Sequence, residues 1–518
     1  MSISKENLLK EIEYMNSLGS RLTGSDAHAA FIRHLEEEIS AMGLPVYRDP
    51  FFFKKWEARE RSLAVVEEDG ALTPLHVSSV HPYSGETPDE GIVEELVEIR
   101  NPTVDYLKAS GKIALVEVGN VNFIPSEVAF DKRSAWPEDV TMPKNYEGPV
   151  ITTFVKFLHT ALSRLTGAKA IILKWKGLPD DCVEGQYLPF NMGYRGIPIL
   201  WVNETDGAVL SEAAAAGKKV KFLLTAEKKE MAYTESFYCI LPGKNEKECV
   251  IVNTHTDGPN CVEENGPVAL LELLRGFKDR ELERTHVFLF TTGHFRLPRF
   301  KDIRTGAFQS ASKWMVRHRD LWDGAANHLK CVANLTLEHL GCKEWSVVDG
   351  EYKYTGQPEL ELVYTGNAFM DRLYIDTVKS RRTVRTMTLH GHNLLHFGEG
   401  QNFFTMGIPG ICLVPAPYYL CTESENGEID KFDIDLMQEQ VETFAALIDR
   451  IEETPTGTLG KSDGYRFVFA NSVSGGRDFT PEGIADGIAD TVDGIIGTIK
   501  EKISDIASDI AEKTKPQE

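Results

Sequence analysis

An alternation of apolar strands and amphipathic helices over residues 237–453 constrains the fold more than any other feature of this sequence. Most of its short apolar runs are followed by a helical pattern, which is typical of an α/β sheet with helices on both faces. The predicted strands are CVIVNTH, THVFLFTTG, KCVANLTLE, LELVYTG and GICLVPA, and the predicted helices are Val268–Phe277, Ala307–Arg317 and Leu436–Ile451. In such a sheet ligands bind beyond the carboxyl ends of the strands, so the residues that follow these runs are candidate site residues.

The first half of the chain has a different pattern. Residues 4–43 predict two helices, and Ser25 and Asp26 precede the second as N-cap candidates. From about residue 60 to 228, short strands alternate with Gly/Pro turns, which indicates an inserted β-rich module. Its predicted strands are SLAVVEE, GKIALVEVG, AKAIILKW, IPILWVNE and KVKFLLTAE, and its predicted helices include Val155–Leu165 and Gly207–Ala216.

Composition excludes several classes of function. At 518 residues the chain exceeds what one hydrophobic core usually supports, so two or three domains are expected. A net charge of −22 argues against nucleic acid or anionic lipid as a partner. No secretory signal or membrane span is predicted, which indicates a cytoplasmic protein. The eight cysteines are scattered, and several lie within apolar runs, so we expect buried thiols and no disulfides.

The C-terminal segment predicts one amphipathic helix. Between Ile484 and Ile510 an isoleucine or valine recurs at steps of three and four, while the opposite face is acidic. Several glycines lower the intrinsic stability of this helix, so we expect it to need a partner surface. That surface belongs to the same chain or to a second subunit, and in the second case the protein is a homo-oligomer. A membrane-interface helix is the alternative, which the acidic face disfavours for anionic lipid.

The segment IVNTHTDGPNCVEENGPVALLELL carries the first candidate site. His255 and Asp257 end an apolar strand, so His255 suits a metal ligand, with Asp257 orienting an imidazole from behind it. Glu263 and Glu264 open the next helix and are expected to lie close to the same point. A glutamate pair at a helix start is also ordinary complementation of the helix dipole, and that interpretation stays open here.

Two further strand ends add polar side chains of the same kind. His294 follows the strand ending in TTG, and Glu338 and His339 follow the strand KCVANLTLE. A buried carboxylate such as Glu338 is costly without a partner or a metal. Histidines and carboxylates that converge on one sheet edge suit zinc or another divalent transition metal.

The order of these features resembles the zinc aminopeptidases and glutamate carboxypeptidases of the metallopeptidase MH clan. The segments that carry the resemblance are SLGSRLTGSDAHAAFIRHLEEEISAMGL, GKIALVEVG, IPILWVNETDGAVLSEAAAAG, HTDG with EENGPVALLELL, and GEGQNFFTMGIPGICLVPAP. It implies a three-layer mixed-sheet catalytic domain with an inserted protease-associated domain. The implied parts are residues 1–60 (N-terminal helices), 61–230 (insert), 231–455 (catalytic α/β domain) and 456–518 (linker and amphipathic helix).

The sequence departs from the family at its active site. The family has a Glu-Glu pair after the second strand, in which the first glutamate is the general base and the second a metal ligand. Here that place reads Gly293-His294, so the base is missing and His294 replaces a carboxylate ligand with a nitrogen donor. The other family ligands fall on Glu263 or Glu264 (bridging aspartate), Glu338 (next carboxylate) and Cys421 (final histidine), and Cys421 fits a buried inert thiol equally well.

Two classes of function follow. In the first, a rebuilt site holds one or two ions of zinc or another divalent transition metal and hydrolyses a peptide or other amide bond in a small substrate. The expected metal ligands are His255, Glu264 or Glu263, His294, Glu338 and Cys421, and the expected catalytic groups are Glu263 and His339 as alternative bases, with Asp257. In the second, the chain is a non-catalytic relative that keeps the scaffold for binding. Cyclisation, or cleavage of a non-peptide amide or an ester, is a third alternative within the enzyme class.

Overall fold

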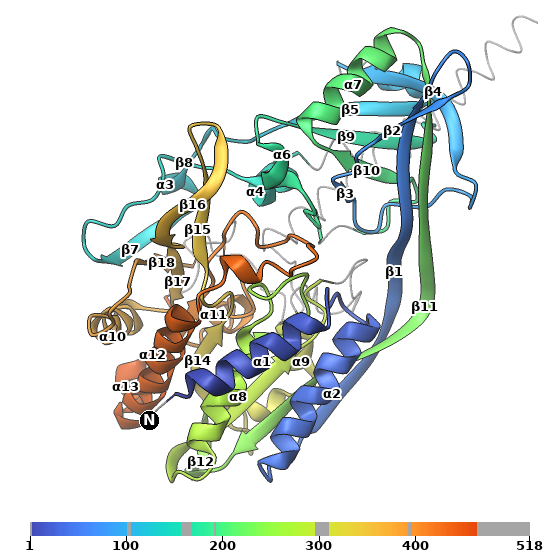
Figure 1. Ribbon diagram of the computed structural model, residues 1–518. Helices are drawn as coiled ribbons and strands as arrows, with labels where there is room; N and C mark the ends of the chain where they lie inside the picture. The colour runs from blue at the N-terminus through green and yellow to red at the C-terminus, as the bar shows by residue number, and fades with distance from the viewer. Residues whose placement is uncertain are drawn as a thin grey trace, which may run out of the picture.

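The computed structural model describes residues 3–100, 105–156, 167–190, 193–295, 310–391 and 396–463, and Figure 1 shows their arrangement. The larger body is a mixed sheet flanked by helices, and a smaller β-rich body is joined to it by two very long strands. The predicted C-terminal helix and most of the predicted helix Val155–Leu165 lie outside the described residues.

The larger body is built on the strand order β11-β13-β12-β14-β19-β17-β18-β7. Strands β13, β12, β14 and β19 are parallel, whereas β17 runs antiparallel to β19 and β11 antiparallel to β13. The strands are β7 Asp131–Trp136, β11 Lys219–Leu241, β12 Gly243–His255, β13 Leu282–Thr291, β14 Lys330–Leu337, β17 Glu361–Thr365, β18 Thr386–His390 and β19 Gly410–Leu413. These confirm the predicted α/β sheet.

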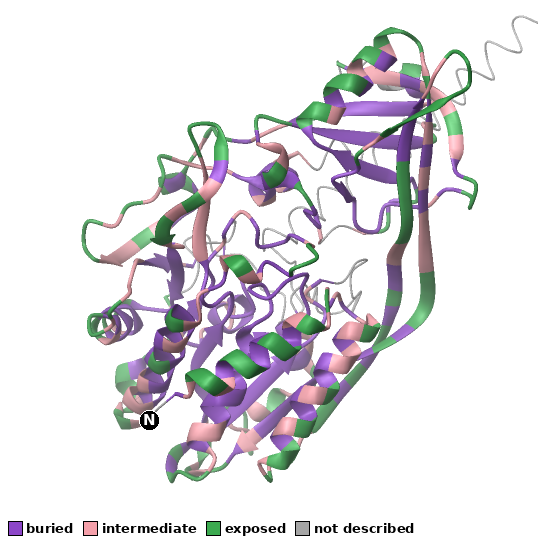
Figure 2. Cartoon of the chain, in the orientation of Figure 1, coloured by how far each residue is buried: buried purple, intermediate pink, exposed green. Residues whose placement is uncertain are grey.

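Helices cover both faces of this sheet and so form three layers. Alternate residues of β12 point to opposite faces of the sheet. Val250 and Val252 belong to the hydrophobic core that the sheet forms with α1, α2, α8, α10 and α12. Cys249 and Ile251 belong to the hydrophobic core on the other face, which the sheet forms with α9 and α11. Figure 2 shows this sheet buried between its helices. The helices are α1 Lys5–Ser17, α2 Asp26–Ala41, α8 Gly266–Phe277, α9 Ser310–Arg317, α10 Ala368–Val378, α11 Gln401–Thr405, α12 Ile434–Glu453 and α13 Thr456–Leu459.

The two N-terminal helices begin as their sequence predicts. Ser4 and Ser25 lie in extended backbone, and their side chains accept hydrogen bonds from the backbone N–H of Asn7 and His28, which caps α1 and α2. The remaining short elements of the larger body are the hairpin β15 Lys343–Val348 with β16 Glu351–Pro358 and the 3₁₀ turns η3 Arg319–Leu321 and η4 Ile429–Lys431.

The ribbon of β1 (Tyr47–Val66) and β11 carries the smaller body. The two strands pair antiparallel from Tyr47 opposite Tyr238 to Val66 opposite Lys219. Beyond the ribbon, the order β3-β10-β9-β5-β4 continues the same sheet from β11, with α7 packed on it. The elements of the smaller body are β2 Leu72–Leu75, β3 Ser79–Val80, β4 Ile92–Ile99, η1 Asp105–Ala109, β5 Ile113–Gly119, β9 Ala170–Lys176, α6 Asp180–Val183, β10 Ile199–Val202 and α7 Glu204–Ala215.

One part of the predicted insert returns to the larger body. Strand β7 pairs antiparallel with β18, so it forms the edge of the larger sheet. The elements around it are β6 Ile124–Pro125, α3 Ser126–Ala129, β8 Asn145–Tyr146 and α4 Pro149–Val155. The assignment of the insert as a protease-associated domain stays a prediction. Among the described residues, no helix has the length and apolar character needed to cross a membrane.

Candidate metal centre

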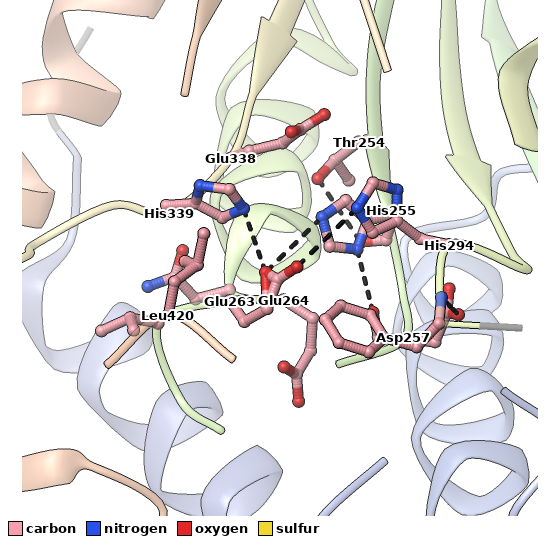
Figure 3. A network of polar contacts seen from close by, with 12 residues as sticks. Thr254, His255, Asp257, Glu263, Glu264, His294, Glu338, His339 and Leu420 are labelled. Atoms are coloured by element: carbon pink, nitrogen blue, oxygen red, sulfur yellow. Dashed lines mark hydrogen bonds and ion pairs between the residues drawn. The ribbon is translucent and has the colours of Figure 1, made fainter. Parts of the chain in front are cut away.

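Three neighbouring parallel strands bring the candidate residues together. His255 is the last residue of β12, His294 follows β13, and Glu338 and His339 follow β14. Because β12 pairs in parallel with both β13 and β14, their carboxyl ends meet at one edge of the sheet. Glu263 approaches the same point from the turn before α8, as Figure 3 shows.

His255, Glu263 and His339 form a compact and fully buried group. One ligand atom of each lies within 4.8 Å of the other two. Oε2 of Glu263 is 3.0 Å from Nε2 of His339 and 3.9 Å from Nε2 of His255. The three side chains point toward one another in Figure 3. Two imidazoles and one carboxylate are a ligand set used by catalytic zinc sites, which keep a further position open for water or substrate.

The backbone fixes which ring nitrogens face this centre. Nδ1 of His255 donates to the carbonyl of Asp257 at 3.0 Å, and Nδ1 of His339 donates to the carbonyl of Pro415 at 2.6 Å. Each Nε2 therefore carries a lone pair rather than a proton, which is the orientation seen in metal-bound histidines. His339 has a positive φ of 57°, a strained conformation for a residue with a side chain.

Among the described residues, the three donor atoms make no hydrogen bond and contact one another only at ion-pair distances. They are Nε2 of His255, Nε2 of His339 and Oε2 of Glu263, and all three are buried. Unpaired buried polar atoms are costly, so such a set calls for a bound group such as a water molecule or a metal ion. Burial holds the pKa of His255 well below its usual range, lowers that of His339 to about 4, and raises that of Glu263. A divalent cation among these atoms would satisfy all three, and the residues therefore fit a metal ion.

His294 lies beside this group as half of a second pair. Its ring stacks on that of His255 with centroids 4.2 Å apart, and its Nε2 is 3.8 Å from Oε1 of Glu263. Its Nδ1 donates to Oε1 of Glu399 at 2.9 Å. Burial alone would lower the pKa of His294, but hydrogen bonding to Glu399 and the charges of Glu399, Glu263 and Glu338 raise it to about 10.

Glu399 is the buried carboxylate that organises this pair. It also accepts hydrogen bonds from Oγ of Ser310 at 2.8 Å and from the backbone N–H of Ala311 at 2.7 Å. Its own backbone N–H donates to Oε1 of Glu338 at 2.7 Å. Glu338, a predicted ligand, thus holds the Glu399 backbone, and its other oxygen is buried without a partner. Burial raises the pKa of Glu338 to about 7.

The carboxylate of Asp257 organises the segment that carries His294. It accepts from the backbone N–H of Gly293 at 3.1 Å and of Phe295 at 2.8 Å, and from Oγ1 of Thr23. Only its backbone carbonyl contacts His255, so the predicted orientation of an imidazole comes from the main chain. Gly293 has a positive φ of 110°, and a glutamate at this position, where the family has its base, would be strained.

Glu264 and Cys421 are not brought into the group of His255, Glu263 and His339. Glu264 forms a fully buried ion pair with Arg21, which also donates to backbone carbonyls of Met15, Gly19 and Asn260. Cys421 packs in an apolar cluster with Tyr187, Leu188, Phe295 and Leu420. Burial raises the pKa of the Cys421 thiol well above its usual range, so the thiolate form is disfavoured.

Several residues of the site have no clear signal in the sequence. Asn260 accepts from the N–H of Glu263 at 3.1 Å and donates to the carbonyls of Tyr419, Leu420 and Thr422, which fixes the turn that presents Glu263. No motif marks Ser310 or Glu399, whose side chains meet at 2.8 Å. For Arg21 an indirect signal existed, since a buried glutamate pair calls for a cation.

Comparison with solved structures identifies the fold. The chain superimposes on a zinc aminopeptidase from Bacillus subtilis with a TM-score of 0.60 and 14% identity, covering 90% of this chain and 99% of that one. The chain has the zinc aminopeptidase fold. An aminopeptidase from Aneurinibacillus sp. strain AM-1 gives 0.55 at 15% identity (90% and 97% covered), and a peptidase M28 precursor from Shewanella amazonensis gives 0.57 at 13% (90% and 98%). No family model and no curated protein sequence matches the chain.

This fold confirms the resemblance that the sequence motifs indicated. At 13–15% identity the likeness establishes the scaffold, while the chemistry has to be argued from the residues present. The scaffold places His255, Glu263 and His339 at the carboxyl edge of its sheet, where ligands bind in α/β folds.

Proposed function

We propose that this protein is a metal-dependent hydrolase that holds one divalent transition metal ion, zinc above all, through His255, Glu263 and His339. The observation that carries the proposal is the set of three buried donor atoms that face one another and make no hydrogen bond among the described residues. When bound, such an ion supplies a Lewis acid that polarises a carbonyl and lowers the pKa of water. The scaffold supports a peptide or other amide bond of a small substrate as the target.

His294 is the proposed proton carrier of this site. It stands beside the ligand group with its Nδ1 held by Glu399, so Nε2 is the atom that exchanges a proton with the reacting groups. Glu338 positions Glu399 through the backbone, which gives the carboxylate–imidazole pair a fixed orientation. This arrangement assigns the proton transfer to a histidine because position 293 is glycine. It gives Glu263 and His339, the bases expected from the sequence, the role of ligands.

Metal content tests the proposal directly. Protein purified without chelator is expected to carry about one metal ion per chain, and dialysis against a chelator should abolish hydrolysis of aminoacyl-anilides. Activity should return with zinc, manganese or cobalt. The measurement is elemental analysis of the protein before and after dialysis. Trace metal only, unchanged after incubation with these ions, would contradict a metalloenzyme.

The Glu399→Gln variant tests the proton carrier. The amide keeps the shape of the side chain but stabilises a protonated His294 less, so we expect kcat to fall about 10–100-fold with metal content unchanged. Steady-state kinetics with elemental analysis measure both. Glu36→Gln is the matched control, since Glu36 in α2 forms an ion pair with Arg48 in β1, away from the site. If Glu399→Gln keeps full activity, His294 is not the proton carrier. If the variant loses its metal ion, the pair of His294 and Glu399 belongs to the metal site instead.

A second candidate function is binding without catalysis. The observation that favours it is Gly293, which carries no side chain where the family has its base and whose positive φ would strain a glutamate there. Protein that keeps one metal ion per chain but turns over no peptide, amide or ester, and forms no cyclised product, would establish this alternative.

We also propose a cytoplasmic location and a homo-oligomer formed by residues 480–518. Light scattering on a variant that lacks this segment tests the oligomer, because the molecular mass in solution should fall to that of a monomer.

A further inference from the structure

A segment of the insert is fastened beside the metal centre by backbone hydrogen bonds. The N–H of Tyr187 donates to the carbonyl of Cys421 at 2.7 Å, and the N–H of Glu423 donates to that of Gly185 at 2.8 Å. Gln186 adds a side-chain bond to the carbonyl of Tyr418 at 2.9 Å. The segment 185–190, which we call the docking segment, is thereby fixed on the loop that follows β19.

Gly185 is required for this close approach. Its φ is +67°, and a β-carbon at this position would overlap the carbonyl oxygen of Glu423. The docking segment therefore lies against the loop at backbone contact distance. The last residue of the docking segment, Phe190, is thereby held beside the ring of His294.

Phe190 is the accessible edge of an apolar cluster next to His294. Its ring stacks on Phe295 with centroids 4.5 Å apart and lies 5.5 Å from the ring of His294. Behind it Tyr187, Phe295 and Cys421 are buried, whereas Phe190 is only half-buried.

We propose that Phe190 is a specificity residue and that the substrate carries an aromatic or large aliphatic side chain next to the bond that is cleaved. The inference rests on the proposed function, because it places that bond beside His294. The half-buried Phe190 ring lies 5.5 Å from the ring of His294, so a side chain next to that bond is within reach of its exposed part. Contact with an aromatic surface favours apolar groups over charged or small ones, typically by 10–200-fold where a few carbons are buried.

The experiment compares phenylalanyl-, leucyl-, alanyl- and glutamyl-4-nitroanilide on the zinc-loaded full chain. Wild type is expected to prefer the first two. Phe190→Ala should lower kcat/KM for these two about tenfold and leave the alanyl substrate within about twofold, whereas Phe190→Leu should retain the leucyl substrate. Gly185→Ala should reproduce the loss without touching the ring. Phe52→Ala, an exposed phenylalanine on the ribbon, is the matched control.

A binding measurement separates this inference from the proposed hydrolysis. Calorimetry with phenylalaninamide and glycinamide on zinc-loaded protein reports selectivity without turnover. If wild type cleaves nothing but binds phenylalaninamide more tightly, and Phe190→Ala removes that difference, the specificity role stands and the hydrolase does not. An unchanged preference in Phe190→Ala by both measurements, or a wild type without preference for large apolar groups, overturns it.

Discussion

Replacement of His339 by alanine is expected to remove the bound metal and to lower hydrolytic activity by about 10³-fold or more. The variant deletes one of the three donor atoms in the group of His255, Glu263 and His339. Loss of an outer partner of a metal ligand already costs 10–100-fold in affinity or activity, so loss of a ligand should cost more. Elemental analysis and kcat/KM on an aminoacyl-anilide measure the two effects.

A control variant at a histidine outside the site shows whether the effect of His339→Ala is specific. His328→Ala removes a partly exposed imidazole that pairs with Asp323 near η3, and it should leave metal content and activity unchanged. Circular dichroism checks that His339→Ala remains folded. If His339→Ala keeps one metal ion per chain while Glu338→Ala loses it, the carboxylate predicted from the sequence is the true ligand.

Replacement of Arg21 by methionine is expected to destabilise the protein by about 3–5 kcal/mol, because it leaves a buried carboxylate without its charge partner. Arg21 is 1% exposed and Glu264 is fully buried. Burial raises the pKa of Glu264 to about 8, while the Arg21 guanidinium opposes that rise. The variant also removes the hydrogen bonds that Arg21 donates to the carbonyls of Met15, Gly19 and Asn260. Urea denaturation followed by fluorescence gives the change in the midpoint.

A double variant and a surface control separate the effect of the buried charge from that of losing any arginine side chain. Arg21→Met combined with Glu264→Met removes both charges and should recover a large part of the lost stability. Arg59→Met removes an arginine whose ion pairs are solvent-exposed, so it should change stability by less than about 1 kcal/mol. A double variant as unstable as Arg21→Met alone would show that the carbonyl contacts, rather than the charge, carry the effect.

The sheet was predictable because its strands are continuous apolar runs. The strands CVIVNTH and KCVANLTLE are buried almost throughout. A short, mostly apolar run of this kind predicts a buried strand from local sequence alone, without knowledge of distant contacts. The convergence of His255, His294 and the Glu338–His339 pair also follows from sequence, since parallel strands end at one edge. Their individual roles do not follow from it.

Which side chain of each pair faces the centre depends on distant contacts. Glu264 turns away because Arg21, far earlier in the chain, holds it, and Glu263 is left to face the histidines. His339 reaches the centre through a left-handed backbone that no local residue type signals. The contact of Phe190 with His294 likewise depends on pairing between the insert and the loop after β19.

The insert is joined to the larger body at more than its two chain ends. The ribbon carries it, β7 returns to form the edge strand of the larger sheet, and the docking segment is hydrogen-bonded to the loop after β19 and places Phe190 beside His294. Residues 61–230 are therefore not a module that can be cut out and exchanged. Excision would expose the edge of β18 and remove Phe190 from beside His294, so we expect the two bodies to fold as one unit.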